Sequence, residues 1–153
     1  MKTKTLTITL ILITLLGACQ AATPLPTVST AKDVEFTLAT DQVAALTDAG
    51  FSIRLMGVAG DERCPSEIEC AISGPVSISL SIQEGDGSST KIDLQTFTDN
   101  NGRAPDGEFE GINDRAVYKG YLIRVVGVAP YPVNLSNPIE ESEYRVTLVV
   151  TQE

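Results

Sequence analysis

The chain of 153 residues contains no histidine and no tryptophan. Histidine is the side chain that most often serves as general base near neutral pH, and it is also a common metal ligand, so its absence narrows the enzyme hypothesis sharply. Aromatic residues make up only 5% of the chain, so a core must consist mostly of valine, isoleucine and leucine. The length suits one domain preceded by a leader.

Basic residues are also scarce. The chain has 11 lysines and arginines against 20 acidic residues, a net charge of −9. Without Lys2 and Lys4, which lie in the expected leader, nine basic and 20 acidic residues remain, a net charge of −11. This balance repels phosphate backbones and anionic headgroups, so we expect neither nucleic-acid binding nor docking on a membrane through a polybasic patch.

No apolar run is long enough to span a bilayer. The longest, from Leu6 to Leu16, has 11 residues, whereas a transmembrane helix needs about 20. Preceded by Lys2 and Lys4, this run has the form of an export signal. It ends in Leu16-Gly17-Ala18-Cys19, which resembles the lipobox of bacterial lipoproteins.

The resemblance implies cleavage after Ala18 and a diacylglyceryl thioether on Cys19, so that acyl chains such as palmitate anchor the chain in a lipid bilayer. The domain would then lie in the cell envelope, on the outer face of the cytoplasmic membrane or at the outer membrane. A plain secretory signal with an incidental cysteine is the other interpretation. We expect a signal peptide over 1–18, a lipidated N-terminus and flexible tether over 19–32, and a folded domain over 33–153.

Apolar and polar residues alternate in many short runs of the folded domain. The clearest run is Val76 to Ile82, and similar runs begin near residues 34, 43, 51, 91, 121 and 144. A period of two predicts half-buried strands. The slip of this period after Leu55 predicts either a bulge near Leu55–Gly57 or burial of the strand on both faces. The glycine-rich residues 84–88 predict a hairpin turn. We therefore expect an all-β antiparallel β-sandwich of about eight strands, immunoglobulin-like or similar.

Cys64 and Cys70 enclose a loop of five residues. An exported protein folds in an oxidising compartment, and Cys19 is assigned to lipid, so these two cysteines are predicted to form a disulfide. A zinc site is disfavoured, because the chain has no histidine or fourth cysteine to complete it. The spacing is also not that of a redox CxxC motif.

The residues around this loop carry a second resemblance. Gly57 to Pro65, followed by Cys70 and Gly74, resembles a motif of uncharacterised bacterial lipoproteins and secreted domains, with Asp-Ser-Arg-Cys-Pro and then Cys-Ile-Trp-Ala-Gly. The run 120–146 is similar to theirs too, so the resemblance covers most of 51–151. The chain departs from the motif at Glu62 and at residues 71–73. The resemblance implies the fold and the disulfide, but no activity.

Asp61 and Arg63 are the candidate interaction residues of this loop. They could form a site for a small anion or for a partner. Alternatively, the Asp61 carboxylate accepts backbone N–H bonds in a turn and Arg63 pairs with a carboxylate or with loop carbonyls.

Oxygen-bearing side chains also cluster between residues 98 and 115, at Asp99, Asn101, Asp106, Glu108 and Glu110. Such a loop suits calcium, but Arg103 occupies a ligand position of the EF-hand template, and we assign no metal site. We expect a non-enzymatic interaction or envelope-structural module with no cofactor, bound to the bilayer through Cys19 and possessing an unidentified protein or glycan partner. Two alternatives are a carbohydrate-active or other hydrolase that uses Asp and Glu, and a calcium-stabilised adhesion module.

Overall fold

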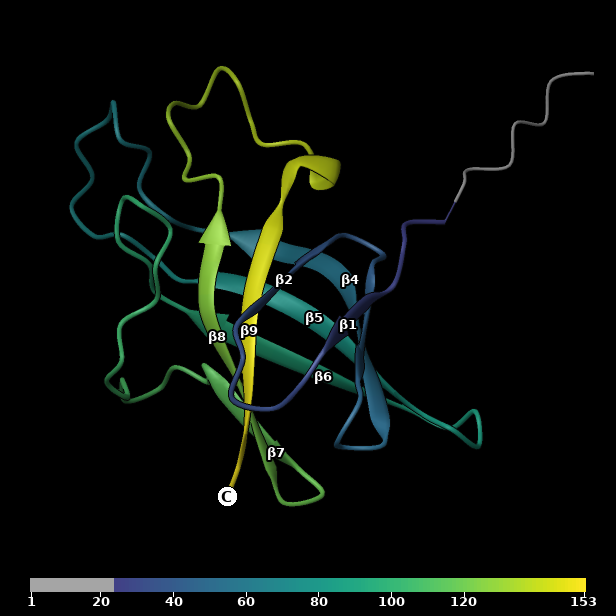
Figure 1. Ribbon diagram of the computed structural model, residues 1–153. Coiled ribbons are helices and arrows are strands. Elements are labelled where there is room, and N and C mark those ends of the chain that lie inside the picture. Colours follow the sequence, from purple (N-terminus) through teal and green to yellow (C-terminus); the bar gives the residue numbers. More distant parts are fainter. Residues whose placement is uncertain (1–23) are drawn as a thin grey trace, which may run out of the picture.

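The computed structural model describes residues 24–153, which form two β-sheets packed face to face and one short 3-10 helix (Figure 1). The predicted signal peptide and Cys19 lie outside the described residues. Within them the chain is all-β, as the alternating runs predict, and it has nine strands rather than about eight.

The first sheet has five strands in the order β1-β3-β4-β5-β6. Their bounds are β1 Val28–Thr30, β3 Val43–Leu46, β4 Phe51–Asp61, β5 Val76–Glu84 and β6 Ser89–Thr96. The second sheet has four strands in the order β2-β9-β8-β7. Their bounds are β2 Phe36–Ala39, β9 Arg145–Gln152, β8 Tyr121–Ala129 and β7 Arg115–Tyr118, and the 3-10 helix η1 spans Glu141–Glu143.

The hydrophobic core lies between the sheets and is built almost entirely of aliphatic side chains. In β5 the residues Val76, Ile78, Leu80 and Ile82 are buried while the serines between them are partly exposed, which confirms the predicted alternation. The opposite sheet contributes a similar row from β8 and β9: Ile123, Val125, Val128, Val146, Leu148 and Val150. Burial of these rows is the main force that holds the sheets together.

The predicted irregularity in β4 is present. The register between β4 and β5 shifts between Leu55 and Gly57, and again between Val58 and Gly60. Gly57 has φ +146°, and a Cβ there would lie 2.6 Å from the Glu141 Oε1 atom. Glycine is therefore favoured at this bulge by its backbone conformation, whereas the exposed Glu141 carboxylate could move aside.

The N-terminal part of the domain differs from the expectation in two ways. β1 lies within the segment 19–32 that was expected to be tether, and it pairs in parallel with β3. A parallel pair is possible because the chain crosses to the other sheet as β2 before it returns as β3. In addition, the alternation near residue 43 points to Val43 and Ala45 as the inward residues of a strand, but in β3 the buried residues are Ala44 and Leu46.

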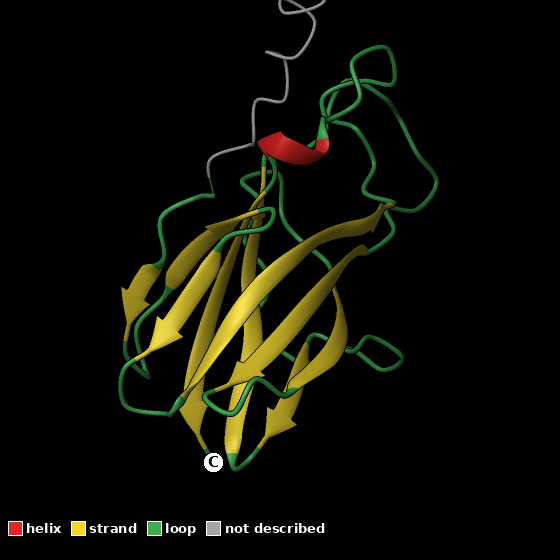
Figure 2. Cartoon of the chain, turned by 90° about the vertical axis from the view of Figure 1, so that its right-hand side faces the viewer, coloured by secondary structure: helices red, strands yellow, loops and turns green. Residues whose placement is uncertain are grey.

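The strand directions bring several loops to one end of the sandwich. The disulfide loop (residues 62–75) joins β4 to β5, and the proline-rich loop (residues 130–144) joins β8 to β9. The start of β1 points to the same end, because β1 runs antiparallel to β4. Figure 2 shows the chain entering the domain close to η1, at the end of the sandwich that bears both loops. Residues 24–27, which lead into β1, and these two loops therefore lie at one end of the described domain.

Candidate functional site

Arg63 lies two residues after the end of β4, and its side chain is completely buried, with 0% exposed. Burial of a guanidinium is costly unless every donor is paired. Its five N–H groups meet five acceptors: the two carboxylate oxygens of Asp61, the carbonyl oxygens of Val128 and Pro130, and the hydroxyl of Thr98. Four of these bonds are between 2.6 and 2.9 Å and the fifth, to Thr98, is 3.5 Å.

This pairing is the one described by the structural interpretation, in which Arg63 pairs with a carboxylate and with loop carbonyls. All five donors are used by residues of the described chain, so the guanidinium has no N–H group left for an external anion. Because Val128 lies near the end of β8 and Pro130 directly follows that strand, the side chain links the first sheet to the second. We call Asp61, Arg63 and their partners the arginine clamp.

Asp61 completes the clamp on the side of β9. Its Oδ1 accepts the Arg63 backbone N–H at 3.2 Å, and its Oδ2 accepts the hydroxyl of Tyr144 at 3.0 Å. Burial raises the pKa of the Asp61 carboxyl, but the hydrogen bonds and charge of Arg63 outweigh burial and hold the net pKa below its usual range. Burial, and after it the charge of Asp61, raise the pKa of Tyr144 to about 12. At neutral pH Asp61 is therefore ionised and Tyr144 is protonated.

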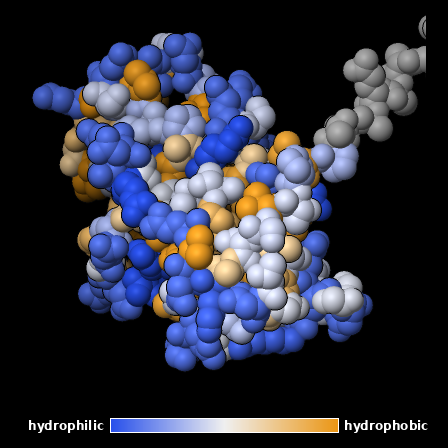
Figure 3. All heavy atoms as spheres, viewed as in Figure 1, coloured by the Kyte–Doolittle hydropathy of each residue, from blue (hydrophilic) through white to orange (hydrophobic). Residues whose placement is uncertain are grey.

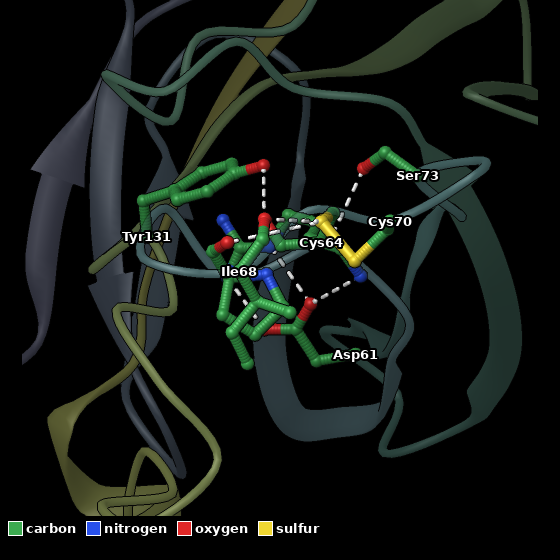
Figure 4. Close-up of a disulfide and its surroundings, with 8 residues drawn as sticks. Asp61, Cys64, Ile68, Cys70, Ser73 and Tyr131 are labelled. Atoms are coloured by element: carbon green, nitrogen blue, oxygen red, sulfur yellow. Dashed lines mark hydrogen bonds and ion pairs between the residues drawn. A yellow bond between two sulfur atoms is a disulfide. The ribbon is translucent and has the colours of Figure 1, made fainter.

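The predicted disulfide between Cys64 and Cys70 is present, with the two sulfur atoms 2.09 Å apart. The neighbouring residues hold Cys64 on both sides (Figure 4): the hydroxyl of Tyr131 donates to its carbonyl at 2.8 Å, and its backbone N–H donates to the hydroxyl of Ser73 at 3.0 Å. The Arg63 guanidinium also lies 5.1 Å from the centre of the Tyr131 ring, within the range of a cation–π contact.

Backbone hydrogen bonds join the disulfide loop to the proline-rich loop. Ser66 N–H donates to the Pro132 carbonyl and Glu67 N–H to the Val133 carbonyl, both at 3.0 Å. The two loops are thus held as one unit by the clamp, by Tyr131 and by these two bonds.

A cavity of about 210 Å³ lies between the two loops, and we call it the loop-end pocket. Its lining combines apolar side chains of both loops with two asparagines and with three residues of the arginine clamp. The lining residues are Asp61, Arg63, Pro65, Pro132, Asn134, Leu135, Asn137, Pro138, Ile139 and Tyr144. A concave, mostly apolar pocket with a few convergent polar groups is the usual form of a binding site.

The acidic loop does not gather its oxygen atoms. Its carboxylates have separate partners: Glu108 pairs with Arg115, and Asp106 pairs with Arg124. The Asp99 Oδ1 atom accepts backbone N–H bonds from Asn101 and Arg103. Arg103 forms a two-bonded ion pair with Glu35. Among residues 24–153, no three acidic or cysteine side chains come together in a group able to hold a metal ion.

Carboxylates also line a shallower hollow of about 540 Å³ beside η1, where Asp41, Glu140 and Glu141 face Arg145. Asp41 is ion-paired there with Arg54 at 2.7 Å. The carboxyl of Glu140 takes part in a capping box with Glu143, which is a structural role at the start of η1.

Sequence reasoning identified Asp61, Arg63 and the two cysteines but not the other residues of this site. Tyr144 stands where an alternating run begins, and Tyr131 stands between two prolines. Flanking prolines favour an ordered loop, but nothing in the sequence indicates the contact of Tyr131 with Cys64.

In the part of the chain that the structure covers, no helix is long and apolar enough to cross a membrane. Comparison of the chain with protein-family models, with curated proteins and with solved structures finds no match. The function must therefore be argued from the sequence motifs and from the geometry of the loop end.

Proposed function

We propose that the chain is a lipid-anchored extracytoplasmic lipoprotein whose β-sandwich acts as a non-enzymatic interaction or envelope-structural module. The observation that carries this proposal is Leu16-Gly17-Ala18-Cys19, placed directly after an apolar run of 11 residues. Two or more acyl chains on Cys19 would give stable anchoring, at about 0.8 kcal/mol for each buried CH₂ group.

The position of β1 in the chain supports a short distance between the lipid anchor and the folded domain. Eight residues, 20–27, separate Cys19 from β1. At full extension eight residues span about 28 Å. An anchored domain would therefore stand close to the bilayer, with the end that bears the loops turned toward its surface.

The state of the titratable groups in the loop-end pocket supports binding rather than catalysis. A general acid or base works best when its pKa lies near the working pH. The pKa of Asp61 is instead lowered, and that of Tyr144 is raised to about 12, away from neutral pH in both cases. Tyr144 donates its hydroxyl hydrogen bond to Asp61, and Asp61 also accepts from Arg63, which suits a structural role.

Cell fractionation of the full chain and of a Cys19→Ser variant tests the anchor. We expect the unchanged chain in the membrane fraction, and the variant either released or retained with its leader uncleaved. The matched control is the double variant Cys64→Ser, Cys70→Ser, which removes the other cysteines and should stay in the membrane fraction. A Cys19→Ser chain that is cleaved and still fully membrane-bound would contradict the proposal.

A further inference from the structure

The loop-end pocket is lined by residues of two loops that are joined by hydrogen bonds, and no role has been assigned to it so far. We propose that it is the docking site for one large apolar side chain carried by a basic segment of a partner protein. This inference rests on the proposed function in one respect, since it takes the domain to be an interaction module.

The size and lining of the pocket indicate which kind of side chain it can accommodate. Small-molecule sites usually measure about 300–1,000 Å³, whereas this pocket measures about 210 Å³. Three prolines, Leu135 and Ile139 supply apolar walls, and Leu135 itself is 78% exposed. A single leucine or phenylalanine side chain would cover this surface, and buried anchors of that kind dominate the free energy of many protein interfaces.

The charged residues that line the pocket, Asp61 and Arg63, favour an apolar group over a charged one as its occupant. Asp61 and Arg63 neutralise each other at 2.6 Å, and the remaining carboxylate and guanidinium positions are already hydrogen-bonded. An incoming ion would have to give up its hydration without finding a free partner of opposite charge. An apolar side chain has no such cost.

Charges outside the pocket select the segment that carries the anchor. Glu67 adjoins the rim through a hydrogen bond from the Asn134 amide, and Glu143 lines the hollow on the other side of Asn137 and Ile139. Both glutamates are exposed. The one cation of the pocket, Arg63, is buried and paired. Lysines or arginines on either side of the partner's apolar side chain would therefore lie near these two glutamates. Such opposite charges favour the encounter and orient the partner.

The pocket is also held in shape before any partner arrives. The disulfide closes one loop, and the backbone bonds from Ser66 and Glu67 attach it to the other. A preformed pocket pays less entropy on binding than a mobile one. Figure 3 shows hydrophobic side chains scattered among hydrophilic ones over the loops at the top of the view, rather than one broad apolar face, which suits a small anchored contact.

Fluorescence anisotropy with a dye-labelled peptide, Lys-Lys-Phe-Lys-Lys, tests the proposal directly. The protein is the exported full chain, held in nanodiscs of zwitterionic lipid if it is lipidated and free in buffer if it is not, so that failure of the anchor does not affect the assay. We expect saturable binding that weakens about tenfold when phenylalanine is replaced by alanine in the peptide. We also expect it to weaken when salt is raised from about 50 mM to about 500 mM.

Substitutions in the protein test whether the peptide binds at the loop-end pocket. Asn137→Trp places a large ring at the exposed rim and should weaken binding at least tenfold, while Val117→Trp, at an exposed position on β7, should leave it unchanged. Leu135→Ala provides a second, milder loss that does not depend on how the new ring packs. Glu67→Gln should reduce the salt dependence, and Glu110→Gln in the acidic loop serves as its control.

Three results would overturn the proposal. One is equal binding of the phenylalanine and alanine peptides, which would indicate charge attraction alone. Another is undiminished binding by both Asn137→Trp and Leu135→Ala in chains with unchanged circular dichroism. The third is no binding up to 1 mM protein, or binding to empty nanodiscs that equals binding to the loaded ones.

Discussion

The arginine clamp gives the sharpest quantitative prediction. Replacing Arg63 with methionine keeps an unbranched apolar stem but removes all five N–H donors. It leaves the Asp61 carboxylate and the carbonyls of Val128 and Pro130 without their partners. Breaking a buried ion pair from one side costs about 3–5 kcal/mol. The described domain has 130 residues, 24–153. At ~2.1 cal/mol/K per residue the loss corresponds to a fall in Tm of about 11–18 °C.

Urea unfolding followed by far-ultraviolet circular dichroism measures this loss. The double variant Asp61→Leu, Arg63→Met should recover most of the stability, because no charge is then left buried alone. Lys91→Met removes an ion pair whose side chains are 64% and 63% exposed and should cost at most about 1 kcal/mol. A loss below about 1 kcal/mol for Arg63→Met would refute the view that the clamp fastens the two sheets together.

Three further predictions concern the backbone, the pH dependence and the disulfide. Gly102→Ala should lower the unfolding free energy by about 2–4 kcal/mol, because φ is +78° and a Cβ would lie 2.5 Å from the Val128 carbonyl oxygen; Gly107→Ala, with open space around it, should change it by less than about 0.5 kcal/mol. Chemical denaturation at a series of pH values measures the stability that ionised Asp61 contributes. This stability should be fully present above the pKa that Asp61 has in the unfolded chain, and it should be lost as pH falls through the lower pKa of the folded state. The stability that protonated Tyr144 contributes should be complete below about pH 10 and lost as pH rises to its folded pKa of about 12. Tyr144→Phe should abolish this alkaline loss of stability, and an unchanged loss in the variant would contradict the assignment. Reduction of the disulfide should cost about 2 kcal/mol for so short a loop, measured as a shift of the urea midpoint, and an unshifted midpoint would contradict it.

The sequence predicted the fold well because its signal is local. In β5 a strict period of two coincides with burial of every second residue from Val76 to Ile82, and the glycine-rich residues that follow form the expected hairpin turn. The slip after Leu55 likewise marks a true register shift against β5. Patterns of this kind depend only on which face of a strand meets the core.

The parts that were missed depend on contacts between distant segments. β1 has only three residues, too few to show a period, and it becomes a strand because β3 offers a free edge. Arg63 meets carbonyl groups 65 and 67 residues away in sequence. Tyr144 reaches Asp61 across 83 residues. No local pattern reports such pairings, so the loop-end pocket could be found only in the folded chain.

Mass spectrometry of the N-terminal peptide, taken from the chain purified out of its native cell, tests the central claim most directly. Anchoring as proposed predicts a mature chain that begins at Cys19, with the mass of a diacylglyceryl group on its sulfur atom, recovered from the membrane fraction. A mature chain that begins at another residue, or one that begins at Cys19 with a free thiol, would contradict the claim.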